Sequence, residues 1–254
     1  DLPQGERDEV ERLRKELSRV STDFDANITK ASAKVQFTRE ELDGLPKDFL
    51  DQDDLLDENG LYELEANVTW HFVTVMENAK LEATRKAMKV TRYSLAAENN
   101  IPLLNEILRL RTLIANKLGY ASWADYKTET KMAGNGATAI QFLKDLSEGL
   151  NSKFAEELES YRAIKAKETK DPEAKINIWD WRYFANQLKK QRYEVDTEQL
   201  RAFFPYDGAL EGMFQTYERI FGLSFSQLEP PYKWVDDLQL FLVSDAKTDE
   251  PLGT

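Results

Sequence analysis

The chain contains one histidine and no cysteine, and these counts limit the chemistry that it can perform. A thiolate nucleophile, a disulfide and a cysteine-bound metal are excluded, because each requires cysteine. The zinc motif H-E-x-x-H needs two histidines one helical turn apart, which His71 alone cannot supply. A Ser-His-Asp triad lacks support, because no serine lies in a recognisable nucleophile motif. Since the neighbours of His71 in "NVTWHFVTVMENA" are apolar, we expect an ordinary helical histidine.

Two further motifs resemble binding sites but fail in their context. "DQDDLLDENG" suggests a calcium loop, yet aligning Gly60 with the loop glycine places Leu55 and Ala66 at the first and last ligand positions. "GNGATA" matches a dinucleotide-binding pattern, but the preceding "TETKMA" is helical in character and not a strand. A loop entering a helix explains both glycines. Neighbouring carboxylates are interpreted as solvated helix faces, because no cleft is evident to place them for acid–base catalysis.

The stretch "INIWDWRYFANQLKK" concentrates aromatic residues around one acid and one arginine. Asp180 is well placed to cap a helix, because apolar residues then recur at i, i+3, i+4 and i+7. This spacing predicts that Trp181 and Phe184 face the core, whereas Arg182 and Tyr183 face outward. A purely structural role for this stretch is the favoured interpretation, and a ligand-binding shelf that includes Arg182 and Tyr183 is the alternative.

The spacing of apolar residues predicts a mostly helical chain. Steps of three and four over residues 10–35 indicate an amphipathic helix of about 28 residues, and the same period continues over residues 72–90. Pro102 is expected to start a helix that ends at Gly119. Thr138 is expected to open another helix, whose apolar face carries Leu143, Leu146, Leu150, Phe154, Leu158 and Tyr161.

Signals of helix ends recur along the chain. Capping pairs are formed by Thr38 with Glu41, Ser122 with Asp125, and Asp196 with Gln199. The last pair would open a helix that carries Leu200, Phe203 and Phe204. A further amphipathic helix is expected to close at Gly222.

Only near the C-terminus does the period change. Residues 234–246, "WVDDLQLFLVSDA", alternate and are rich in β-forming residues, so they predict one strand. "KTDEPLG" would be its turn, and the second strand of the hairpin is expected beyond Thr254. The predicted fold class is therefore mainly α: an antiparallel helical array with one C-terminal β-strand or partial hairpin.

Length and charge bound the classes of partner. The 254 residues suit one large or two small domains, and 34 basic against 46 acidic residues give a net charge of −12. This negative charge argues against binding nucleic acid or an anionic membrane surface, and it is compatible with basic peptides as partners. The sequence contains no apolar run of the roughly 20 residues that a membrane span needs, and its first residues are too polar for a signal peptide. We expect a cytoplasmic protein.

Several stretches read together resemble the zinc metallopeptidases of the thimet oligopeptidase, neurolysin and oligopeptidase A family. The resemblance rests on short sequence segments that occur in the same order and at the same spacing as in this family, across nearly the whole chain. In order these are "ELDGLP", "ATRKAM", "ENNIPLLNEILRLRTLIANKLGYASWADY", "FLKDL", "WDWRYF" and "LFLVSD" leading to "PLG". One departure is minor: "WVDDL" stands where the related enzymes often carry W-H-x-D-V.

The resemblance implies an elongated helical enzyme whose deep, narrow channel admits only short peptides. In the family, the H-E-x-G-H zinc helix, the third zinc ligand and the transition-state-stabilising tyrosine and histidine come later than "LFLVSD". No catalytic or zinc-binding residue of the family maps onto this chain, so we expect an internal portion that binds no zinc itself, and a further helical segment before Asp1. Residues 1–170 would supply scaffold and channel wall, and residues 171–254 would lead into the catalytic region. Arg182 and Tyr183 are the candidate residues for lining the channel that the resemblance implies.

Two functional hypotheses follow. In the first, the chain is part of a zinc-dependent metalloendopeptidase that hydrolyses short peptides, with the zinc in the parent enzyme and no activity in these residues alone. In the second, it is a non-catalytic helical module that binds peptides or a partner protein on the same scaffold. An exposed strand over residues 234–244, from Trp234 to Ser244, would then favour self-association.

Overall fold

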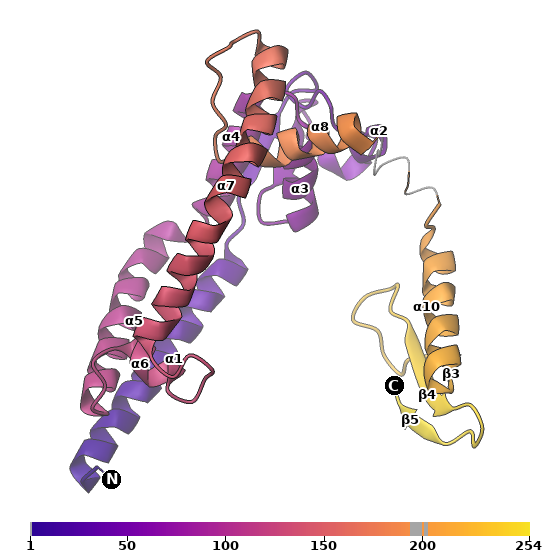
Figure 1. Ribbon diagram of the computed structural model, residues 1–254. Helices are drawn as coiled ribbons and strands as arrows, with labels where there is room; N and C mark the ends of the chain where they lie inside the picture. The colour runs from indigo at the N-terminus through magenta and orange to yellow at the C-terminus, as the bar shows by residue number, and fades with distance from the viewer. Residues whose placement is uncertain (1, 194–199, 201–202) are drawn as a thin grey trace. The chain divides into compact units, whose positions relative to one another are not determined.

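The structure, a computed structural model, describes residues 2–193, 200 and 203–254, which divide into two compact units (Figure 1). The first unit is Asp1–Glu194 and the second is Val195–Thr254. The helix that follows residue 170 packs on earlier helices of the first unit, and the predicted division after residue 170 stays a prediction. The roles assigned to the two predicted regions remain predictions.

The first unit begins with two antiparallel helices, α1 (Gln4–Lys30) and α5 (Ala97–Lys117), which lie side by side (Figure 1). Asn27 near the end of α1 donates to Asn100 near the start of α5, at 2.9 Å. The buried side chains between the two helices are Leu13, Val20, Ile107, Leu110 and Ile114. This pairing confirms the mainly α character that the apolar spacing predicts.

Two helix boundaries differ from prediction. Helix α1 ends at Lys30 instead of continuing to residue 35, because the backbone at Ala31 turns extended and leads into the strand β1 (Lys34–Phe37). Helix α5 begins at Ala97, so Pro102 lies inside it instead of starting it. A proline there removes only one N–H donor, which the packing of α5 against α1 tolerates.

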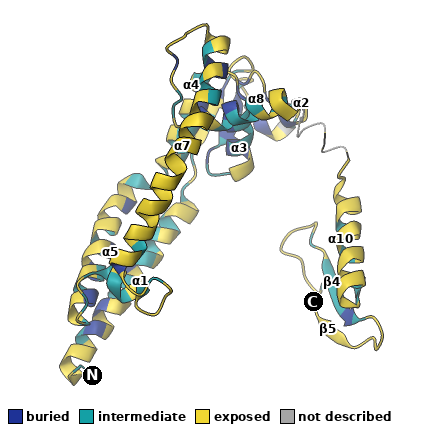
Figure 2. Cartoon of the chain, viewed as in Figure 1, coloured by how far each residue is buried: buried dark blue, intermediate teal, exposed yellow. Residues whose placement is uncertain are grey.

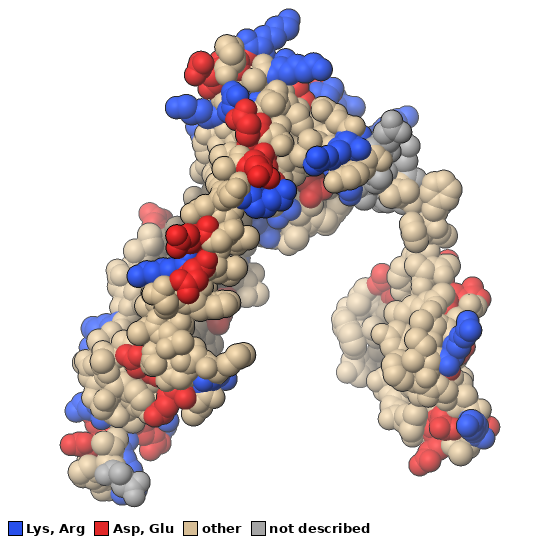
Figure 3. Space-filling model, viewed as in Figure 1, with Lys and Arg blue, Asp and Glu red and all other residues tan. Residues whose placement is uncertain are grey.

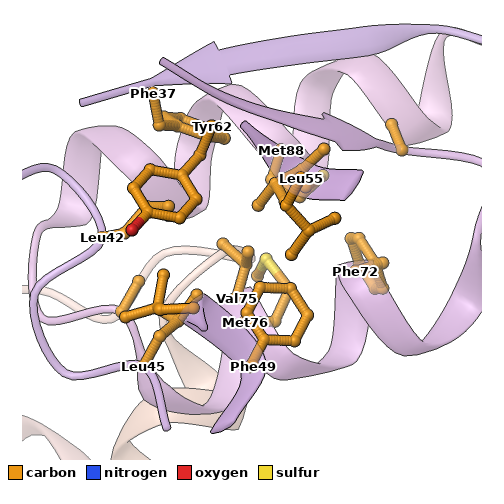
Figure 4. Close-up of a cluster of buried hydrophobic side chains, with 14 residues drawn as sticks. Phe37, Leu42, Leu45, Phe49, Leu55, Tyr62, Phe72, Val75, Met76 and Met88 are labelled. Carbon is orange, nitrogen blue, oxygen red and sulfur yellow. The ribbon is translucent and has the colours of Figure 1, made fainter. Parts of the chain in front are cut away.

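A compact core lies around the antiparallel pair of strands β1 and β2 (Tyr62–Glu65) (Figure 4). Its other walls are α2 (Lys47–Leu50), the 3-10 turn η1 (Asp53–Leu55), α3 (Thr69–Asn78) and α4 (Glu82–Tyr93). The predicted helical run over residues 72–90 is therefore two helices, because the backbone at Ala79 is extended.

The loop "ELDGLP" closes against the junction of α3 and α4. The capping box is confirmed: the Thr38 N–H donates to the Glu41 carboxylate at 2.8 Å, and the Glu41 N–H donates to the Thr38 hydroxyl at 3.2 Å. Gly44 has φ +101°, and a Cβ there would lie 2.2 Å from the Asn78 carbonyl oxygen. Only glycine fits this close approach.

Three more helices complete the first unit. They are α6 (Trp123–Thr128), α7 (Gly136–Thr169) and α8 (Trp181–Tyr193). The predicted cap of α6 is confirmed, since the Ser122 hydroxyl accepts from the Asp125 N–H. Asn135 caps α7 by accepting from the Thr138 N–H at 2.8 Å, which explains "GNGATA" as a helix entry. Helix α8 packs on α7 and α3.

Within residues 203–254, a helix packs on a three-stranded sheet. Helix α10 (Tyr206–Phe221) ends at Gly222 in the left-handed conformation, as predicted. The strands β3 (Leu223–Leu228), β4 (Leu240–Asp245) and β5 (Pro251–Gly253) are antiparallel in the order β3-β4-β5. The predicted capping pair of Asp196 and Gln199 lies outside the described residues.

The C-terminal β-structure is more extensive than the predicted strand or partial hairpin. Strand β4 covers only residues 240–245 of the predicted residues 234–246, and it pairs on one side with β3 and on the other with β5. The turn "KTDE" leads back to β5, so the described residues already contain a partner strand for β4. The exposed, unpaired strand invoked for self-association over residues 234–244 is therefore not observed among the described residues, and self-association itself remains a prediction.

Candidate functional site: a buried ionic cluster beneath an apolar groove

Asp180 of "WDWRYF" is completely buried and connects three parts of the first unit. Its carboxylate accepts hydrogen bonds from the Arg85 guanidinium on α4 and from the Lys165 ammonium on α7, both at 2.7 Å. It also accepts from the backbone N–H of Asn177 at 3.0 Å. Asp180 precedes the first residue of α8 as predicted, but these partners make it the centre of an ionic cluster as well as a helix start.

Arg85 supplies one buried positive charge of the cluster. Its guanidinium donates to the carbonyl oxygens of Ala79 and Lys80 at 2.7 and 2.8 Å, so it also closes the junction between α3 and α4. The same guanidinium lies 4.5 Å from the centre of the Tyr183 ring, within the range of a cation–π contact. A charge this buried is stable only when it is paired and hydrogen-bonded.

Lys165 and Glu82 extend the cluster toward solvent. The Lys165 ammonium donates to Glu82 at 2.7 Å, and Glu82 also accepts from the side chains of Asn177 and Trp179, each at 2.9 Å. Burial alone would raise the pKa of Glu82, but these hydrogen bonds and the Lys165 charge outweigh it and lower the pKa. Burial likewise opposes the Lys165 charge, yet Asp180 and Glu82 raise its pKa overall.

The structure reverses two predicted orientations in the aromatic stretch. Tyr183 is buried at 4% exposure, whereas Trp181 is 41% exposed. The physical reason is the cluster: the Arg85 guanidinium faces the Tyr183 ring, and the Tyr183 hydroxyl lies 3.4 Å from Glu168. Burial raises the pKa of Tyr183 to about 12, and it also raises the pKa of Glu168. The prediction that Phe184 faces the core is confirmed, at 2% exposure.

Arg182 lies at the surface as predicted. Its guanidinium is 4.6 Å from the centre of the Trp181 ring and 3.6 Å from the Glu77 carboxylate. The two candidate channel residues therefore have different surroundings, since Arg182 is accessible and Tyr183 is enclosed. Their role as channel residues stays a prediction.

An apolar groove of about 460 Å³ lies next to the cluster. One wall is the later part of α7, and the other is the segment that leads into α8. The lining residues are Phe154, Glu157, Leu158, Tyr161, Ile176, Asn177, Ile178 and Trp181. The groove continues into the exposed face of α7, where most of the helix is yellow in Figure 2. The sequence and its motifs did not predict this groove.

Residues 75–254 match the model of peptidase family M3. The chain belongs to peptidase family M3. The chain is similar in sequence to longer proteins: it is 29% identical to a probable thimet oligopeptidase of Arabidopsis thaliana over 97% of its own length and 34% of that protein. It is 29% identical to saccharolysin of Saccharomyces cerevisiae over 96% of the chain and 36% of that protein. For oligopeptidase A of Salmonella typhimurium, the identity is 26% over 98% of the chain and 38% of that protein.

The comparison confirms the resemblance to thimet oligopeptidase and oligopeptidase A. The chain spans little more than a third of the length of these M3 relatives, at 34%, 36% and 38%. Two of the motifs that carry the resemblance meet in the fold, since Arg85 belongs to "ATRKAM" and Asp180 to "WDWRYF". The ionic cluster therefore joins two of the stretches on which the resemblance rests.

His71, the single histidine of this M3 chain, is engaged within the fold. The Nδ1 atom of His71 accepts a hydrogen bond from the Glu65 N–H at 3.2 Å, and the ring packs edge-on against Trp70 and Phe49. Burial lowers the pKa of His71, despite the nearby carboxylates. No three side chains of histidine, cysteine, aspartate or glutamate gather to hold a metal in the part of the chain that the structure describes.

The segment "DQDDLLDENG", which suggests a calcium loop in sequence, has a structural role. One oxygen of Asp57 accepts from the backbone N–H groups of Asn59 and Leu61, both at 2.9 Å, and so closes the turn before β2. These hydrogen bonds outweigh burial and lower the pKa of Asp57.

No helix among the described residues of this M3 chain is both long enough and apolar enough to cross a lipid bilayer.

Proposed function

We propose that these residues form scaffold and peptide-channel wall in a zinc-dependent metalloendopeptidase that hydrolyses short peptides in the cytoplasm. The observation that carries the proposal is the family match over residues 75–254 together with the single histidine, which is engaged within the fold. The names of the relatives, thimet oligopeptidase and oligopeptidase A, support peptides as the substrate class. Zinc and its ligands would then come from outside these residues, and the chain alone would be inactive.

The chain's own contribution in this proposal is positioning. The Arg85–Asp180–Lys165 cluster holds α4, α7 and α8 together, so the surfaces that these helices present are fixed before any peptide arrives. A preorganised wall reduces the entropy cost of binding a flexible substrate. Arg182, at the surface of α8, would line the channel; Tyr183 would support it from below by packing on Arg85.

A peptidase assay on two forms of the protein tests this proposal. A quenched fluorescent peptide of about ten residues is incubated with the purified chain and with the intact product of its natural gene, each with zinc and then with a chelator. We expect chelator-sensitive cleavage by the natural product only. Chelator-sensitive cleavage by these residues alone would contradict the scaffold role, and no cleavage by either form would contradict the peptidase.

The second hypothesis is a non-catalytic module that binds peptides or a partner protein on the same scaffold. The exposed apolar face of α7 favours it, because exposed apolar patches of this kind mark interaction surfaces. The same assay separates the two: a module predicts that the natural gene product binds peptides but leaves them intact.

A further inference from the structure

Both walls of the apolar groove are attached to the ionic cluster. On one wall, Asn177 lies between Ile176 and Ile178, and its backbone N–H and side-chain amide donate to Asp180 and Glu82. On the other wall, α7 is held through Lys165, which donates to the same two carboxylates. The groove is therefore formed in advance, which reduces the conformational cost of filling it.

The lining of the groove is apolar and accessible. Phe154 and Leu158 lie one helical turn apart on α7, and Ile178 and Trp181 face the groove from the other wall. Phe154 is 62% exposed and Ile178 is 63% exposed. Side chains of this size are seldom left accessible in contiguous groups unless something binds there. A volume of about 460 Å³ suits one or two side chains of a ligand and not a folded domain.

One charged group marks the edge of the groove. Glu157 is the only acidic or basic residue among the described residues that line it. The nearest cation in contact, Lys153, is 3.8 Å from Glu157, but both side chains are exposed, so this pair is weak and exchangeable. On the face shown in Figure 3, acidic and basic residues are interspersed, so selectivity must come from local groups such as Glu157. The groove is thus complementary to an apolar side chain with a cationic neighbour.

We propose that the groove binds a short peptide segment in which a large apolar residue is adjacent to arginine or lysine. The apolar side chain enters between Phe154, Leu158 and Trp181, and the cation pairs with the Glu157 carboxylate. Planar guanidinium suits this carboxylate better than ammonium, because it can form two parallel hydrogen bonds. This binding needs no hydrolysis, so the proposal stands or falls separately from the peptidase function.

Fluorescence anisotropy on the purified chain tests the proposal. The probe is a labelled nonapeptide with a central Phe-Arg-Arg sequence, used with a chelator and checked for integrity by mass spectrometry. Two matched peptides replace both arginines by glutamate, or the phenylalanine by serine. We expect saturable binding of the first peptide and at least tenfold weaker binding of each of the others.

The chain offers a matched pair of charge variants. Glu157→Lys should weaken the binding of the Phe-Arg-Arg peptide at least tenfold and strengthen that of the glutamate peptide. Glu148→Lys changes the net charge equally, but it lies nine residues earlier on α7, on the opposite helix face at 100° per residue. The affinity of the Glu148→Lys variant for the Phe-Arg-Arg peptide should stay within twofold of that of the original chain. Circular dichroism confirms that both variants keep their helical content.

Three results would overturn the proposal. Equal loss in the two charge variants would show non-specific attraction to an acidic protein. An absence of saturable binding would show that the groove takes no such peptide. Sedimentation of the chain as a dimer, with Trp181 protected from quenching by iodide, would show that a second copy covers the groove.

Discussion

Apolar residues recur with the same spacing at both ends of α7, but only one end has its apolar face covered by other elements. Near the C-terminal end, Ile164 and Lys165 are buried at 8% and 5% exposure, because α8 and the ionic cluster pack there. Nearer the N-terminal end, Ile140 and Leu143 are 52% and 60% exposed within the unit. The comparison shows that a helical stripe identifies the face that can be buried, whereas a neighbouring element decides whether it is buried.

The covered end is also the one with buried charge. Arg85 and Asp180 are almost inaccessible, and each has several partners, so the cluster stabilises the fold only while it is complete. The exposed end has no such network among the described residues, and it is held by its cap, by the Gly136 N–H that donates to Asp125 at 2.9 Å, and by helix propensity. Mutations should therefore have unequal effects on the two ends.

The largest effect should come from Asp180→Ala. The substitution leaves Arg85 and Lys165 buried without their shared carboxylate, which should cost about 3–5 kcal/mol of unfolding free energy. Urea denaturation followed by circular dichroism measures it. The control is Asp43→Ala, which removes an exposed pair with Lys80 and should cost no more than about 1 kcal/mol. Similar losses in the two variants would show that the cluster is not the anchor of α7.

A pair of identical substitutions on α7 compares its ends directly. Ile164→Ala removes a buried side chain and should lower the unfolding free energy by about 2–5 kcal/mol. Ile140→Ala changes an exposed residue, so it should stay within about 0.5 kcal/mol of the original chain. The same denaturation experiment measures both. A large loss in Ile140→Ala would mean that the exposed face is covered in solution.

At the exposed end, the cap of α7 should matter more locally than globally. Asn135→Ala removes the acceptor for the Thr138 N–H, which should cost about 1 kcal/mol of helix stability. Hydrogen exchange should show faster exchange in the first turns of α7 and little change around Lys165. Asn135→Asp keeps an acceptor and is expected to behave like the original chain. Uniform acceleration along α7 would contradict an independent N-terminal end.

The smallest effect should be in pH dependence, where Glu82 and Glu168 act in opposite directions. The lowered pKa of Glu82 contributes stability above its unfolded value of about 4.3, and this is lost as pH falls through the folded pKa. The raised pKa of Glu168 contributes stability below that value, which is lost as pH rises through the folded pKa. Each contribution should be below about 1 kcal/mol, because solvent screens both partly exposed groups.

Glutamine variants separate the two carboxylates. Relative to the original chain, Glu82→Gln should lose stability as pH rises from about 4 to 7, and Glu168→Gln should gain it. Denaturation at several pH values gives the two slopes. If the stability difference changed with pH in the same direction in both variants, the pKa of Glu82 and the pKa of Glu168 would not be shifted in opposite directions.

Local signals in the sequence were sufficient for many helix ends. The Thr38 and Ser122 capping pairs and Gly222 depend on contacts within a few residues, so they could be predicted before the fold was seen. The candidate channel residues were less predictable. Tyr183 and Trp181 are both aromatic and two positions apart on one helix, so their periodicity does not decide which of them meets the core.

The cluster and the sheet required long-range information. Arg85 and Asp180 are 95 residues apart, and nothing in the sequence near either one identifies the other as its partner. The strand β5 is only three residues long, so its β-character is set by pairing with β4 and not by its own composition. Such features arise when distant segments meet.

By itself, the sequence determined the helical class, most caps, the acidity and the exclusion of cysteine chemistry, because these follow from composition and from neighbours along the chain. It also carried the motifs of the family. The tertiary structure decided that Arg85 and Lys165 share one carboxylate, that Tyr183 is enclosed, and that Trp181 faces a groove. Burial and ion pairing belong to the assembled fold, since each depends on residues that only folding brings together.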